Sequence, residues 1–227
     1  MARNGTWHDD YWLLLMQLYL RKPTGVKALY DRKLVELSLE LHIPPQALQA
    51  RMQQLARLET PRIERLWHTY SKDPQRLSRA VRLLRSMRGF GDAGQFYEGV
   101  EVQETFEKDF RPIVPSTKEI PDKDKPLEQR LTPAMLAMIL NLYFQLTPST
   151  MVSTTPEVRE LAKLLHLNAD EVVKVMDIYQ TCDPYLGHDT MVISPLLLPC
   201  QQMWQRFGNL DPTVLHTYAE ELKEYFL

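Results

Sequence analysis

LSLELHIPPQALQARM, residues 37–52, is an amphipathic helical pattern that is interrupted in its middle by His-Ile-Pro-Pro. Apolar residues recur at helical spacing on both sides of the interruption, and proline suits the first turn of a new helix because its missing N–H would have no partner there. The stretch therefore predicts two helices joined by a tight turn. A second stretch of the same kind, LAKLLHLNADEVVKVM, lies at residues 161–176.

The two stretches align without a gap when the first is shifted by 124 positions. The alignment extends upstream with the same shift. Downstream it continues with a shift that is 13 or 14 positions larger, because the second half has that many additional residues before its matched tryptophan. The matched landmarks are His42 with His166, Met52 with Met176, Tyr19 with Tyr143, Trp67 with Trp204, and Asp73 with Asp211. So many landmarks in one order indicate an internal duplication.

We therefore expect a mainly α fold with two duplicated lobes, namely lobe one at residues 1–90 and lobe two at residues 128–227. An acidic connector that contains prolines, residues 91–127, joins them, and its stretch at 111–126 is expected to be an extended linker. The best candidate for a strand is residues 96–106, with a weaker one at 190–198, so a short strand or hairpin is the most β-structure that we expect.

Capping residues followed by proline mark several helix starts. Each lobe is expected to contain four main helices and a shorter one around its matched tryptophan. The expected bounds are about 10–21, 31–41, 45–58 and 74–88 in lobe one, and about 133–145, 156–165, 169–181 and 212–226 in lobe two.

The composition excludes several classes of protein. With 44% apolar and 25% charged residues it is typical of a soluble globular chain, and no apolar run is long enough to cross a bilayer. The first residues, MARNGTWHDDYW, do not resemble a signal peptide. Two cysteines, Cys182 and Cys200, give neither a disulfide framework nor a metal cluster, which favours a cytoplasmic location.

Charge is distributed unevenly along the chain. Residues 44–90 hold ten basic and three acidic residues, a net charge of +7. Residues 91–124 and 125–227 each carry a net charge of −5. A basic lobe one next to an acidic connector and an acidic lobe two predicts different partners for the two lobes.

ELAKLLHLNADEVVKVMDIY, residues 160–179, resembles the helix-turn-helix of DNA-binding proteins. Small Ala162 lies where the two helices would cross, with leucines facing inward before the turn. Lobe one departs from this pattern, since Ser38 replaces the alanine and Arg51 occupies a usually apolar position. Both lobes have histidine where glycine is usual in the turn, although histidine tolerates a positive φ. A winged version would add a hairpin after the third helix, for which lobe one leaves little room.

The resemblance implies that the third helix of lobe one contacts nucleic acid. Glutamine and arginine can read adenine and guanine in the major groove, and flanking arginines can hold phosphates. The wheel of the last helix of lobe one places Leu77, Ala80, Val81, Leu84 and Met87 inward and Arg79, Arg82 and Arg85 outward. The candidate nucleic-acid-binding residues are Gln46, Gln53, Gln54, Arg57, Arg62, Arg65, Arg79, Arg82 and Arg85.

Two other interpretations remain open for these residues. They can form an ordinary solvated face, or the acids Glu98, Glu101, Glu104, Glu107 and Asp109 can fold back and neutralise the arginines. Lobe two carries acids on its third helix and would repel phosphates, so we expect it to bind a second copy or another protein. A helical protein-interaction module without nucleic-acid contact is the alternative function.

Catalytic motifs are not found in the sequence. It contains no Gly-rich phosphate loop, no His-x-x-x-His or Cys-x-x-Cys pair, and no nucleophile elbow. We therefore expect no enzyme activity, cofactor or metal.

Overall fold

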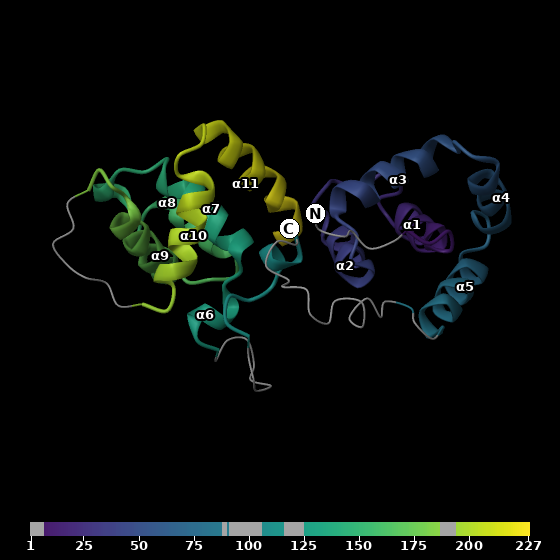
Figure 1. Ribbon diagram of the computed structural model, residues 1–227, viewed down its shortest axis with the longest axis horizontal. Coiled ribbons are helices and arrows are strands. Elements are labelled where there is room, and N and C mark those ends of the chain that lie inside the picture. Colours follow the sequence, from purple (N-terminus) through teal and green to yellow (C-terminus); the bar gives the residue numbers. More distant parts are fainter. Residues whose placement is uncertain (1–6, 88–89, 91–105, 116–124, 187–193) are drawn as a thin grey trace. The chain divides into compact units, whose positions relative to one another are not determined.

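The computed structural model describes residues 7–87, 90, 106–115, 125–186 and 194–227 (Figure 1). The chain divides into two compact units, Met1–Thr105 and Phe106–Leu227, which contain lobe one and lobe two respectively. The described residues contain α-helices and short 3-10 turns and no strand, which confirms the mainly α fold class.

Five helices make up the described part of lobe one. They are α1 (Tyr11–Leu20), α2 (Arg32–Leu41), α3 (Pro45–Arg57), α4 (Pro61–Tyr70) and α5 (Pro74–Ser86). Helix α1 is the most apolar and packs against α3, α4 and α5, while α2 packs on α3. Its buried residues therefore form the centre of the core of this lobe.

Lobe two repeats this arrangement with an additional N-terminal segment. Its elements are the 3-10 turn η3 (Phe106–Phe110), α6 (Leu127–Arg130), α7 (Pro133–Tyr143), the 3-10 turn η5 (Pro148–Thr150), α8 (Pro156–Leu164), α9 (Ala169–Cys182), α10 (Leu197–Phe207) and α11 (Pro212–Phe226). Helix α7 packs against α9, α10 and α11, and α8 packs on α9. Helices α7 to α11 therefore correspond in order to α1 to α5 and repeat the packing of α1 on α3, α4 and α5, whereas the extensive contact between α9 and α10 has no equal between α3 and α4.

The helix ends lie within about two residues of the expected bounds. Several Asp-Pro and Thr-Pro starts are used as caps, although Thr155 before α8 makes no capping hydrogen bond. Asp73 and Thr132 each accept a hydrogen bond from a backbone N–H of the first turn, as the sequence predicts. The strand candidate at 96–106 lies outside the described residues except for Phe106, which belongs to η3. The weaker candidate at 190–198 is described only from residue 194, where the chain enters α10.

The expected linker is partly structured. Residues 106–115 form η3 and a short extended piece that packs with lobe two, where Ile113 N–H donates to the Leu131 carbonyl at 2.9 Å. Val114 N–H donates to the Glu128 carbonyl at 3.1 Å. These backbone bonds make this part of the connector a component of lobe two.

The turn between the second and third helices has the same geometry in both lobes. His42 and His166 both have a φ of 55°, in the left-handed region. In each lobe the N–H of the following residue donates to the carbonyl five positions earlier, from Ile43 to Ser38 at 3.1 Å and from Leu167 to Ala162 at 2.8 Å. This is the hydrogen bond of a Schellman helix end, which closes the first helix and redirects the chain.

A small residue lies at the helix crossing in both lobes. Ser38 is fully buried, and its hydroxyl donates to the Ile43 carbonyl. The serine thus replaces alanine without leaving an unsatisfied polar group. Ala162 is buried at the matched position in lobe two.

The matched tryptophans make the same contact in both lobes. The rings of Tyr19 and Trp67 are 5.7 Å apart at an interplanar angle of 77°, and those of Tyr143 and Trp204 are 5.8 Å apart at 73°. Both pairs are edge-to-face arrangements that join the first helix of a lobe to its fourth. Such agreement between side chains supports the duplication inferred from the sequence.

The left-handed turn residue gives a first prediction. His166 is exposed, so His166→Gly should stabilise the protein and His166→Val should destabilise it, each by about 1 kcal/mol, because only glycine adopts this conformation without steric cost. Urea unfolding measures both changes. Lys163→Gly, at an exposed helical position, is the control and should destabilise by about 1 kcal/mol. Equal effects of the two glycine variants would contradict the role of the turn.

The end of α10 gives a second prediction. A Cβ on Gly208 would lie 2.7 Å from both the carbonyl oxygen and the indole Nε1 of Trp204. Gly208→Ala should therefore destabilise lobe two by about 1–3 kcal/mol and change the near-UV circular dichroism of the tryptophan. Ser71→Ala, at the matched position of lobe one, should leave stability within about 0.5 kcal/mol. A neutral Gly208→Ala variant would show that the backbone relaxes freely here.

Candidate nucleic-acid interface

One face of α3 is turned to solvent along its whole length. The buried residues Leu48, Met52 and Leu55 face the core. The opposite face is formed by residues spaced four, three and four apart, which places them in one row. This row, called the α3 stripe, consists of Gln46, Ala50, Gln53 and Arg57, all exposed. It contains no acid.

Lobe two presents the matched row on α9 with a different charge. The positions 124 residues later are Asp170, Lys174, Asp177 and Thr181. Their inward neighbours Val172, Met176 and Tyr179 are buried, as on α3. The scaffold is therefore the same, but two carboxylates lie on the outward face of α9 and oppose the approach of phosphates.

The N-terminal end of α9 also has a neighbour that α3 lacks. Glu171 hydrogen-bonds the backbone N–H of Asn168 as part of a capping box and forms an ion pair with Arg130 of α6. The matched residue of α3 is Ala47. The start of α9 is thus attached to α6 by charged side chains, whereas the start of α3 has no such attachment among the described residues.

Arg51, the polar residue at a usually apolar position of α3, has an intramolecular role. Its guanidinium lies 4.2 Å from the ring centroid of Trp7 and 5.8 Å from that of Trp12. A cation over an indole ring is stabilised by the negative face of the π system. Arg51 therefore fixes the N-terminal segment to the side of α3 and leaves the α3 stripe exposed.

The three glutamines of α3 that the sequence predicts as base contacts differ in their hydrogen bonds and exposure. The amide of Gln46 donates to the Tyr30 hydroxyl at 3.4 Å, a long hydrogen bond that holds it weakly. Gln53 is exposed, whereas Gln54 is only partly exposed and lies at the edge of the stripe.

Three arginines gather where α3 passes into α4. Arg57 is 3.4 Å from the Glu59 carboxylate, and Arg62 forms an ion pair with Asp9 at 3.0 Å. The Arg65 Nε donates to the Pro61 carbonyl at 3.3 Å, and no carboxylate pairs with Arg65 among the described residues. Since the ion pairs are exposed and weak, a phosphate can compete for these guanidinium groups.

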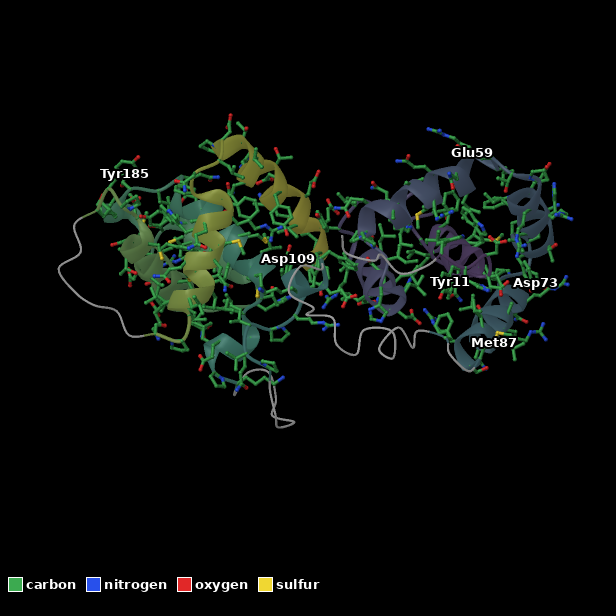
Figure 2. The ribbon with its side chains drawn as sticks, in the orientation of Figure 1. Tyr11, Glu59, Asp73, Met87, Asp109 and Tyr185 are labelled. Carbon is green, nitrogen blue, oxygen red and sulfur yellow. The ribbon has the colours of Figure 1, made fainter. Side chains whose placement is uncertain are left out.

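The arginines of α5 form a separate group. Helices α3 and α5 lie on opposite sides of α1 in Figure 1, and Figure 2 shows Glu59, just after α3, far from Met87, just after α5. Arg79 and Arg82 are exposed and without an ion pair in the described part of the chain. The nine predicted residues thus lie on two surfaces: one on α3 and α4, and the other on α5.

Arg85 is engaged within lobe one. Its Nε and Nη2 donate to the two carboxylate oxygens of Glu40 on α2 at 2.7 and 2.8 Å. These hydrogen bonds raise the pKa of Arg85. The two residues also line a pocket of about 450 Å³ between α1, α2 and α5. Arg85 therefore connects two helices.

The prediction that Met87 faces inward is wrong. Helix α5 ends at Ser86, and Met87 directly after it is 62% exposed. Leu83, which the helical wheel did not place inward, is 68% exposed. A comparison of α5 with α11 would have identified Leu83 as an exposed position, since Glu221 matches it.

Two acids of the connector pair with basic residues of their own unit. Glu107 pairs with Arg111 at 2.8 Å. Asp109 accepts two hydrogen bonds from Arg206 at 2.9 and 3.0 Å and one from the Tyr218 hydroxyl at 3.0 Å. Both acids are therefore neutralised inside lobe two. Glu98, Glu101 and Glu104 lie outside the described residues.

Nothing in the described residues suggests a reactive centre. They contain no group of three or more His, Cys, Asp or Glu side chains placed to hold a metal. Burial raises the pKa of the Cys200 thiol to about 12, so it stays protonated at neutral pH. Along the described ranges, every helix is too short or too polar to cross a membrane.

Comparison of the chain with protein-family models, curated proteins and solved structures found no match. The resemblance to a helix-turn-helix therefore depends on the residues and geometry described above.

The bidentate pair on α5 gives a third prediction. Arg85→Ala should lower the free energy of unfolding by about 0.5–1 kcal/mol, because it removes an ion pair between α5 and α2. Arg82→Ala removes an exposed arginine with no partner and should change stability by less than about 0.5 kcal/mol. Urea unfolding of both variants, and of Glu40→Ala with and without Arg85→Ala, isolates the coupling. If the changes in the free energy of unfolding of Glu40→Ala and Arg85→Ala simply add in the double variant, the ion pair contributes nothing to stability.

Proposed function

We propose that this protein is a helix-turn-helix protein that binds double-stranded DNA through lobe one. The observation that carries the proposal is the α3 stripe, an exposed row of Gln46, Ala50, Gln53 and Arg57 without an acid. Its matched row on α9 contains two aspartates. Helix α9 therefore serves as a reference for α3 on the same scaffold. Of the two helices, only α3 has an outward row that is compatible with phosphates.

The chemistry of the α3 stripe suits a major groove. A glutamine amide can make a bidentate pair with adenine, an arginine with guanine, and an alanine methyl can contact the methyl group of thymine. Arg62 and Arg65 extend from α4 beside the end of α3 and would contact the DNA backbone. B-form DNA is favoured over double-stranded RNA, because the major groove of A-form RNA is too narrow to admit a helix.

Lobe two has a different proposed role, in assembly with a second copy or another protein. Its acidic α9 stripe argues against phosphate contact, while the packing of α7, α8 and α9 preserves the fold. The rival proposal is a helical protein-interaction module in which neither lobe binds nucleic acid. We propose a cytoplasmic location in both cases, in keeping with the free thiols of Cys182 and Cys200.

Binding of the full-length protein to a fluorescent mixed-sequence DNA duplex across a salt series tests the proposal. Because two arginines of α4 would neutralise phosphates, the logarithm of the association constant should fall with the logarithm of salt with a slope of about −2. Arg65→Ala should make the slope shallower by about one. Ala50→Glu, which places a carboxylate at the centre of the α3 stripe, should weaken binding at least tenfold without unfolding the protein.

Lobe two supplies the matched control. Lys174→Glu lies at the position on α9 that corresponds to Ala50 and changes the charge of the protein by two units. It should leave DNA affinity unchanged, and an RNA duplex should bind more weakly than DNA. No binding at low salt, or equal losses in Ala50→Glu and Lys174→Glu, would overturn the proposal and leave the interaction module as the better account.

A further inference from the structure

The last helices of the two lobes align without a gap when α5 is shifted by 138 positions onto α11. Their inward residues are of the same kind and are buried in both lobes. The matched buried residues are Leu77 with Leu215, Val81 with Ala219, and Leu84 with Leu222. The two helices therefore present equivalent outward faces, which can be compared position by position.

The outward face of α5 is apolar and basic. Leu83 and Met87 lie four positions apart, with Arg79 and Arg82 beside them, and both arginines lack an ion pair within the described ranges. Helix α5 itself contains no acid, and Asp73 before it is used as the N-cap. We call Arg79, Arg82, Leu83 and Met87 the α5 face. Leu83 of the helix and Met87 directly after its end are both large and exposed, and an exposed apolar patch is typical of an interaction surface.

The matched end of α11 is occupied by another segment of lobe two. Tyr225, which corresponds to Met87, packs against Phe110 of η3 with ring centroids 5.0 Å apart. The preceding residue, Asp109, binds Arg206 and the hydroxyl of Tyr218 on α11, and Figure 2 shows it beside the C-terminal part of that helix. The motif that covers this helix end is therefore an aromatic residue next to a carboxylate.

We propose that the α5 face binds a short segment of a partner protein that carries an aromatic residue beside carboxylates. The aromatic ring would pack on Leu83 and Met87, and the carboxylates would pair with Arg79 and Arg82. In lobe two the ring of Phe110 packs on Tyr225, the match of Met87, whereas Asp109 pairs with Arg206 and Tyr218. The matches of those two residues in lobe one are Thr69 and Ala80, so the carboxylates of the partner are inferred from the exposed charges of Arg79 and Arg82.

Other occupants fit the α5 face less well. A second copy that docked by the same face would bring the two sets of unpaired arginines together, and like charges oppose such a symmetric contact. Nucleic acid would satisfy the arginines but would offer its charged backbone to Leu83 and Met87. The proposal is independent of DNA binding, since α5 and α3 lie on opposite sides of α1 (Figure 1).

A peptide-binding experiment with the full-length protein tests this surface. The probe is a fluorescein-labelled peptide with the sequence TFEKDFR, residues 105–111 of this chain, followed by fluorescence anisotropy. The control peptide carries alanine for both phenylalanines and lysine for the aspartate. We expect the first peptide to bind and the control peptide to bind at least tenfold more weakly.

Variants locate the bound peptide. Leu83→Glu, which introduces the residue that α11 has at this position, and Arg79→Glu combined with Arg82→Glu should each weaken peptide binding at least tenfold. Both sites are exposed, so circular dichroism should be unchanged. Val214→Glu, an exposed apolar-to-acid change on α11, is the matched control and should leave the affinity unchanged.

Several outcomes would overturn the proposal. The first is the absence of peptide binding, and the second is peptide binding that the α5 variants leave intact. The third is peptide binding that appears only after Glu98, Glu101 and Glu104 are changed to glutamine, because it would identify a segment of this chain as the occupant of the α5 face. Loss of DNA binding without loss of peptide binding in Leu83→Glu would assign the surface to nucleic acid. Peptide binding without any DNA binding would leave this proposal standing while the DNA proposal fails.

Discussion

The left-handed residue at the turn between the second and third helices determines the geometry of both lobes. At His42 and His166 the positive φ reverses the chain within three residues, and the hydrogen bond from the following N–H back to Ser38 or Ala162 holds it. The small residue lets the two helices approach closely. The orientation of α3 and α9 follows from this constraint, and so does the division of each between a buried row and an exposed row.

Because this constraint is internal to each lobe, the outward residues can differ between the lobes without a change of fold. Positions that face the core keep their character, as Leu48 and Val172 or Leu84 and Leu222 illustrate. Outward positions change their character, since Gln46 and Gln53 of lobe one are aligned with Asp170 and Asp177 of lobe two. Charge on a solvated face has little effect on folding but a large effect on which partners can approach. Two lobes with one scaffold can therefore bind chemically different partners.

Most of the fold could be predicted from the sequence, because the helix starts, the turn and the apolar periodicity are local signals that the tertiary structure retains. The helix bounds and the exposed positions of Gln53 and Arg57 follow from those signals. Contacts between distant residues were not predictable in the same way. Arg51 on Trp7, Arg85 on Glu40 and Asp109 on Arg206 each join residues that no helical wheel relates. They removed Arg85 from the candidate surface and placed two connector acids in lobe two. Met87 was misplaced because a wheel assumes that the helix continues, whereas α5 ends one residue earlier.

The attachment of η3 to lobe two separates the repeat from the folding unit. The repeated part of lobe two begins at α7, yet Asp109 and Phe110, which precede it, supply the partners of Arg206 and Tyr225. A recombination event that transferred only the repeated helices would leave a partly buried guanidinium without its carboxylate and an aromatic ring without its neighbour. The structural module of this half is therefore longer than its repeated helices, and the extra segment must be included whenever the half is grafted onto another protein.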